Sequence, residues 1–128
     1  MNYSFGYFKY TKNPNKLIVE VDQEIQNYYR NLIPIKTNRQ KYPAHITVMR
    51  GENPNHFINI INNQIIYFWY YGFIHENEKY FWINVHCPKL KDIRQLIGLN
   101  PEHTLSKPPD SSNCFHITIA NKKGLNEI

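Results

Sequence analysis

The chain has 128 residues, of which 41% are hydrophobic and 20% charged, enough to bury one core but too few for several domains. We therefore expect a single domain over residues 1–128, which excludes a multidomain enzyme. Lys and Arg (15) outnumber Asp and Glu (10), which gives a formal net charge of +5, and 15% of the residues are aromatic. A basic, aromatic-rich domain of this size favours phosphate-bearing partners.

Cysteine content and hydropathy bear on the compartment. The two cysteines, Cys87 and Cys114, are too few for the disulfide framework of a small secreted protein. No arginine-rich or apolar leader precedes the first strand-like segment. The longest apolar run, residues 65–73, is far shorter than the roughly 20 residues of a membrane-spanning helix. We expect no membrane contact and a reducing, cytoplasmic location, which would be the host cytoplasm if the protein is viral.

The first part of the chain is predicted to form a strand followed by a helix. Residues 3–10 are aromatic-rich without helical periodicity, and turn-forming residues follow at 13–15, so we expect a strand that ends near Thr11. One amphipathic helix is then expected to begin near Lys16 and to end before Pro34. Its apolar side chains recur at intervals of three to four residues: Leu17, Val21, Ile25, Tyr28 or Tyr29, and Leu32.

The middle of the chain is predicted to be mainly strand. Residues 44–49 form a short β-type run closed by turn signals. A short helix is expected over 54–61, capped by Asn53. Residues 65–73 and 79–87 are both β-rich and are expected to form a hairpin around a turn at 75–78.

The last part is predicted to form a helix, a loop and a strand. Pro88 at the first helical position and a terminating Gly98 delimit the helix. A loop rich in Pro, Ser and Asp follows at 100–113 and leads into a strand at 114–120.

This order of elements predicts an α+β fold. Strand, helix and strand are followed by hairpin, helix and strand, which suggests a duplicated arrangement. We expect two pseudo-symmetric lobes of antiparallel strands, each backed by a helix, with an active-site cleft between them. A ferredoxin-like sandwich without duplication is the alternative.

The most informative feature is a repeated His-x-Thr motif. His45-Ile46-Thr47-Val48 and His116-Ile117-Thr118-Ile119 are nearly the same four residues, 71 positions apart, each in a predicted short strand. Because side chains alternate between the faces of a strand, His and Thr share one face while the aliphatic residues pack on the other. Each motif therefore presents an imidazole and a hydroxyl to the same surface.

Two facing imidazoles suit phosphodiester cleavage without a metal. One removes a proton from the attacking hydroxyl or water, and the other protonates the leaving oxygen. The hydroxyls of Thr47 and Thr118 can donate to the non-bridging oxygens, where negative charge develops. The near symmetry of the motifs leaves open which of His45 and His116 is the acid. We expect neither a metal nor another cofactor.

Other arrangements of reactive residues are less favourable. The remaining histidines lack partners at matched spacing and are interpreted as surface or structural residues: His56, His75, His86 and His103. A zinc site built from His86, Cys87, Cys114 and His116 lacks the usual paired spacing and would use one of the repeated histidines. A nucleophile triad around residues 110–112 lacks a nucleophile elbow.

Aromatic residues are candidates for stacking on nucleobases. Tyr10 is the first choice, because it lies at the end of the first predicted strand beside a basic turn, and Trp69 is the second. Packing in the core is the ordinary role of an aromatic side chain in so small a domain.

A small domain with two His-x-Thr strands resembles the two-histidine phosphoesterase superfamily. The resemblance implies that His45 and His116 are the general acid and base and that Thr47 and Thr118 bind the phosphate. Within the superfamily, the chain is most similar to the phage anti-CBASS phosphodiesterases. That similarity rests on the short length, the early first motif, the separation of the motifs and the sequence of residues 115–119.

The resemblance implies hydrolysis of 3′–5′ linkages in cyclic oligonucleotide second messengers, which would counteract a nucleotide-signalled antiviral defence. The first alternative is the same chemistry on RNA 2′,3′-cyclic phosphates or 2′,5′-oligoadenylate. The second is a non-catalytic nucleotide- or RNA-binding module. In each case the expected partner is a cyclic oligonucleotide or a short RNA, with no membrane and no stable protein partner.

Overall fold

The computed structural model describes residues 1–102 and 115–123. The strands are β1 (Asn2–Thr11), β2 (Lys16–Val21), β3 (His45–Arg50), β4 (Ile65–Tyr70), β5 (His75–Glu76), β6 (Tyr80–His86) and β7 (Phe115–Asn121). The helices are α1 (Gln23–Leu32), α2 (Ile58–Ile61) and α3 (Lys89–Leu96).

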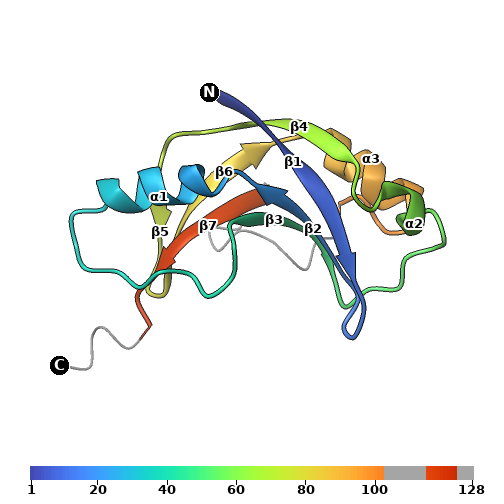
Figure 1. Ribbon diagram of the computed structural model, residues 1–128, viewed down its shortest axis with the longest axis horizontal. Helices are drawn as coiled ribbons and strands as arrows, with labels where there is room; N and C mark the ends of the chain where they lie inside the picture. The colour runs from blue at the N-terminus through green and yellow to red at the C-terminus, as the bar shows by residue number, and fades with distance from the viewer. Residues whose placement is uncertain (103–114, 124–128) are drawn as a thin grey trace.

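Within the described residues, the seven strands belong to one sheet, in the order β4-β1-β2-β3-β7-β6-β5. The neighbouring strands are antiparallel, and β4 also pairs with β6, so the sheet closes on itself as a barrel with β5 added beside β6. In Figure 1, α1 lies at the left of the molecule, and α2 and α3 lie together at the right. The fold is a mixed, strand-rich arrangement compatible with the predicted α+β class.

The predicted duplication is visible, but the two-lobe layout with a cleft is not confirmed. Two units of strand, helix and strand, β2-α1-β3 and β6-α3-β7, meet where β3 pairs with β7. Both units carry a β-bulge, one at residues 17–18 and the other at residues 81–82. The sequence predicted two similar halves as separate lobes. In the structure β3 pairs with β7, so the two halves form one continuous sheet.

The core face of this sheet is formed by the aliphatic residues that alternate with the motif residues. Val19, Ile46, Ile117 and Ile83 lie in one row across β2, β3, β7 and β6, and all four are fully buried. Burying each such side chain stabilises the fold by about 1.5–3 kcal/mol. This burial fixes which face of β3 and β7 points away from the core.

The helix predicted from Lys16 is wrong over its first six residues, which form β2. Leu17, Val19 and Val21 are buried and alternate with less buried neighbours, as in a strand with one face on the core. The helix begins only after Asp22, whose carboxylate accepts a hydrogen bond from the backbone N–H of Glu24. Apolar residues at 17 and 21 fit both periods, and pairing with β1 and β3 selects the strand.

Two predictions for the middle of the chain also need correction. The short helix covers only Ile58–Ile61, and Asn55 rather than Asn53 accepts a hydrogen bond at its start, from the N–H of Phe57. The predicted hairpin is limited to two pairs between β4 and β6, because β4 pairs mainly with β1. The expected turn at 75–78 contains β5, which pairs with β6.

The remaining element predictions are confirmed. The strands at 3–11, 44–49 and 114–120 correspond to β1, β3 and β7, and the helix between Pro88 and Gly98 to α3. Gly98 has φ 85°, a left-handed conformation that glycine adopts without strain at the end of a helix. Most of the predicted loop at 100–113 lies outside the described residues.

Candidate active site

The strand register brings the two motifs together. Ile46 of β3 pairs with Ile117 of antiparallel β7, so His45 stands next to Thr118 and Thr47 next to His116. All four side chains are half-buried and lie on the face opposite the buried Ile46–Ile117 row. Directly paired residues have Cβ atoms about 4.5–5.5 Å apart, so two imidazoles and two hydroxyls share one small surface.

The first motif is held at its start by local hydrogen bonds. The side-chain oxygen of Gln23 accepts a hydrogen bond from the backbone N–H of Ala44 at 2.6 Å, and its side-chain nitrogen donates to the carbonyl of Ala44 at 3.2 Å. The Nδ1 of His45 lies 2.7 Å from the carbonyl oxygen of Pro43. Since a carbonyl oxygen only accepts, Nδ1 of His45 is the protonated nitrogen in this contact. Nε2 is therefore the ring nitrogen that can exchange a proton with substrate.

A buried arginine from the second half holds the other end of β3. The guanidinium of Arg94 on α3 is fully buried and donates to the carbonyl of Val48 at 2.9 Å. It also forms a bidentate ion pair with Glu52, with both distances 2.9 Å. The position of Thr47, one residue before Val48, therefore depends on α3.

The second motif is bordered by β6 and α1. Trp82 pairs with Thr118 and Asn84 with His116 in the β6–β7 register. Gln26 of α1 donates from its side chain to the carbonyl of Thr118 at 3.1 Å. The corresponding neighbours of the first motif on β2 are Ile18, beside Thr47, and Glu20, beside His45. The two halves thus match in backbone register but differ in the side chains that flank the motifs.

One histidine near the second motif was not identified as a site residue from the sequence. His75 pairs with Trp82, and its ring stacks on the indole with centroids 5.5 Å apart and an interplanar angle of 16°. Its Nε2 lies 3.1 Å from the side-chain nitrogen of Asn84. No local pattern pointed to this position, because a two-residue strand between turn-forming residues has no detectable period.

The proposed base-stacking residues lie on strands that carry no motif. Tyr10 pairs with Leu17 on the core side of the sheet, packs partly against the core, and donates its hydroxyl to Asn15 at 2.9 Å. Trp69 lies on β4, beside Tyr3 at 4.5 Å, on neither strand that carries a motif. Their roles in binding substrate stay predictions.

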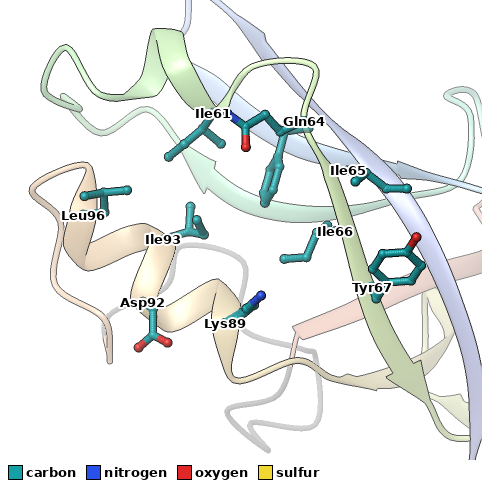
Figure 2. Close-up of a pocket in the computed structure, with 10 residues that line it drawn as sticks. Ile61, Gln64, Ile65, Ile66, Tyr67, Lys89, Asp92, Ile93 and Leu96 are labelled. Carbon is teal, nitrogen blue, oxygen red and sulfur yellow. The ribbon is translucent and has the colours of Figure 1, made fainter.

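A separate pocket of 650 Å³ lies between β4, α3 and the end of α2 (Figure 2). Its lining is mainly apolar, including Ile61, Ile66, Ile93 and Leu96, and its polar groups are Gln64, Lys89, Asp92 and the hydroxyl of Tyr67. None of the motif residues borders it. Its size alone therefore does not make it the catalytic site, because it lacks the paired acid and base that the motifs supply.

Within residues 1–102 and 115–123, no three His, Cys, Asp or Glu side chains are grouped closely enough to hold a metal. Cys87 is buried, and burial raises the pKa of its thiol. Cys114, His103 and the serines at 111 and 112 lie outside the described part of the chain. The zinc and triad alternatives, which use these residues, are not tested.

The site and fold define a class of protein: a phosphoesterase domain with two His-x-Thr strands paired at the centre of an antiparallel sheet. Residues 13–126 match the family model of the Swiss Army Knife 2H phosphoesterase domain. The chain therefore belongs to the 2H phosphoesterase family. This membership implies a phosphodiesterase-type hydrolase with a nucleotide or RNA substrate. No curated protein and no solved structure matches the chain.

Of the helices that the structure describes, none has the length and apolar character needed to cross a membrane.

Proposed function

We propose that the protein is a metal-independent phosphodiesterase that opens 3′–5′ linkages in cyclic oligonucleotide messengers and so counteracts nucleotide-signalled antiviral defence. The observation that carries the catalytic part is the register of β3 and β7, which sets His45 beside Thr118 and His116 beside Thr47. The family membership supports the phosphodiester substrate. The cyclic form follows from the resemblance of the motifs to the anti-CBASS group.

The reaction uses the 2′-hydroxyl of the substrate as nucleophile. One histidine takes the 2′-hydroxyl proton while the O2′–P bond forms, and the other gives a proton to O5′ as the P–O5′ bond breaks. Water then opens the 2′,3′-cyclic phosphate with the histidine roles reversed. The hydroxyls of Thr47 and Thr118 donate to the non-bridging oxygens as their charge increases. After the second step both histidines have returned to their starting protonation states.

The test is a substrate panel in the presence of EDTA. The purified protein is incubated with cyclic di- and trinucleotides, 2′,5′-oligoadenylate and a 2′,3′-cyclic mononucleotide, and the products are separated by chromatography. Cleavage of a cyclic messenger despite the chelator supports the proposal. Turnover of only 2′,5′-oligoadenylate and the 2′,3′-cyclic mononucleotide would indicate an enzyme that processes RNA ends. Binding without turnover would indicate a non-catalytic module.

A matched substrate tests the nucleophile. A cyclic dinucleotide whose 2′-hydroxyls are replaced by hydrogen has the same 3′–5′ linkages but cannot form a 2′,3′-cyclic phosphate. We expect it to bind and to resist cleavage. Cleavage at the rate of the ribose compound would contradict attack by the 2′-hydroxyl.

A further inference from the structure

A smaller pocket, of about 290 Å³, lies beside the first motif. Its lining comes from residues 4–7 of β1 and residues 20–22, where β2 ends and α1 begins. Glu20 pairs with His45 across β2 and β3, and Tyr7 pairs with Glu20 across β1 and β2. Because directly paired residues share a face of the sheet, Tyr7 and Glu20 lie on the face that carries His45. The acid–base scheme above uses neither of them.

Two aromatic rings form one wall of this pocket. Phe5 and Tyr7 alternate with the core-facing residues of β1, and their side chains are 47% and 46% exposed. The rings meet at an interplanar angle of 88° with centroids 6.0 Å apart, so they form a corner rather than a stack. An exposed aromatic ring can stack on any nucleobase, because every base has a π-face. This wall therefore suits a planar ring of a ligand.

The charged groups of the pocket are both carboxylates. Among residues 1–102 and 115–123, Glu20 forms no ion pair, and Asp22 caps α1 with one oxygen, Oδ1. No Lys or Arg is found among the described residues of the lining, so it does not favour a phosphate. Nor do the two carboxylates belong to a described group of three metal ligands. Since an ionised carboxylate only accepts hydrogen bonds, the pocket suits a planar group that carries N–H donors on its edge.

We propose that this pocket binds a nucleobase of the substrate and selects guanine. The base stacks on the rings of Phe5 and Tyr7, and its Watson–Crick edge donates to Glu20. Guanine presents N1–H and the N2 amino group side by side, so one carboxylate can accept from both. Adenine and cytosine offer only an amino group there, and the single N–H of uracil lies between two carbonyl oxygens, which a carboxylate repels. This inference rests on the proposed function, because it names the base beside the phosphate that the motifs hold.

The position of the pocket suits a base joined to the reacting phosphate. Neighbouring strands lie about 4.8 Å apart, so Tyr7 on β1 is roughly 10 Å from His45 on β3. That separation is comparable with the span from the phosphate to the base of one nucleotide. Glu20 stands between the two, where it can meet the edge of the base while the phosphate remains at the motifs.

Kinetics on cyclic dinucleotides of different bases test the selection. For wild type, kcat/KM should be highest for cyclic di-GMP, lower for cyclic di-AMP and lowest for cyclic di-UMP. Glu20→Gln keeps the size but removes the charge and one acceptor. It should lower kcat/KM for cyclic di-GMP about tenfold or more and change cyclic di-AMP little. Glu24→Gln is the matched control, because it removes an exposed carboxylate of α1 that does not line the pocket. Equal losses in Glu20→Gln and Glu24→Gln would overturn the proposal.

The stacking contact is tested separately. Tyr7→Leu keeps an apolar side chain but removes the ring, so kcat/KM should fall about fivefold or more for all three substrates alike. Tyr28→Leu is the control, since Tyr28 is 60% exposed on α1 and does not line the pocket. It should behave as wild type. Wild-type kinetics in Tyr7→Leu would contradict the placement of the base on this wall.

Binding of mononucleotides tests the pocket without turnover. Isothermal titration calorimetry with GMP, AMP, CMP and UMP should give the tightest binding for GMP and the weakest for UMP, and Glu20→Gln should remove this preference. Equal affinities for the four in wild type would overturn the selection of guanine. If no cyclic substrate is cleaved but the GMP preference depends on Glu20, the proposed function fails and the pocket stands. If cyclic dinucleotides are cleaved at one rate whatever their bases, the pocket fails and the proposed function stands.

Discussion

The two halves of the site have the same motif but hold it in different ways. In the first half, His45 is fixed by a contact two residues away, with the carbonyl of Pro43, and its neighbour on β2 is the carboxylate-bearing Glu20. In the second half, His116 stands beside the amide of Asn84, which is bonded to His75 on a further strand. A repeated sequence therefore does not imply repeated surroundings, and we expect the two histidines to differ in their tolerance of neighbouring substitutions.

The largest effect is expected from removing either imidazole. His45→Ala and His116→Ala should each lower kcat by about 10²- to 10⁴-fold, because each removes the acid or the base. Both side chains are half-buried and outside the core, so thermal unfolding should be nearly unchanged. Steady-state kinetics on a cyclic dinucleotide measures this loss. Wild-type turnover in one variant would mean that its histidine is neither the acid nor the base.

The connection between the halves is tested by Glu52→Gln. The substitution leaves the fully buried Arg94 without its carboxylate, and breaking such a buried pair costs about 3–5 kcal/mol of unfolding free energy. Urea denaturation measures it. The exposed pair between Lys91 and Glu102 is the control, since Glu102→Gln should cost at most about 1 kcal/mol. Equal losses would mean that the ion pair of Glu52 with Arg94 contributes no more than an exposed pair.

The two hydroxyls can be compared directly. Thr47→Val and Thr118→Val keep the shape and remove the donor, so each should lower kcat by about 10²- to 10³-fold. Thr→Ser at the same positions retains the hydroxyl and should retain most of the activity. Kinetics on the same cyclic dinucleotide would show whether one threonine contributes more. Full activity in both Val variants would exclude hydroxyl donation to the phosphate.

A smaller effect is expected at the entry to the first motif. Gln23→Ala removes the acceptor for the buried N–H of Ala44, at a cost of about 1–3 kcal/mol, and allows His45 to shift. Activity should fall more than in Gln64→Ala, where the amide only donates to the carbonyl of Ile60. Urea denaturation and steady-state kinetics of both variants measure these losses. Equal activity in the two variants would mean that the position of His45 does not depend on Gln23.

The smallest effect concerns the free energy of unfolding at high pH. Burial raises the pKa of Tyr29 and of Tyr70, whose rings contact each other 6.1 Å apart. The unfolded chain loses these protons near pH 10, before the folded protein does, so stability is full below pH 10 and falls as the pH rises above it. Tyr70→Phe should weaken this decline. Urea midpoints between pH 8 and 11 would measure it, and an unchanged slope would contradict the assignment.

The motif strands were predictable because their pattern is short and complete. The alternation in residues 45–48 and 116–119 gives the face of each side chain before any partner is known. The start of α1 was not predicted, since Leu17 and Val21 fit two periods and only pairing with β1 and β3 selects one. The Asp22 cap was the local signal that could have separated strand from helix.

What joins the site is long-range and therefore absent from the local pattern. The pairing of β3 with β7 crosses 71 positions of sequence, and the sequence predicted two facing motifs without their register. The bidentate contact of Arg94 with Glu52 and the placement of His75 beside Asn84 also depend on tertiary pairing. Residue types alone do not reveal such partners.

The closure of the sheet through β4 and β6 affects how the molecule meets other copies of itself. An open sheet ends in unpaired N–H and C=O groups that recruit a strand from another chain. Here β4 has β1 on one side and β6 on the other, and the closure consists of two residue pairs, Trp69 with His86 and Tyr70 with Val85. Fluctuations that part these pairs would expose both strands, so amide exchange at this seam and self-association at high concentration should rise together.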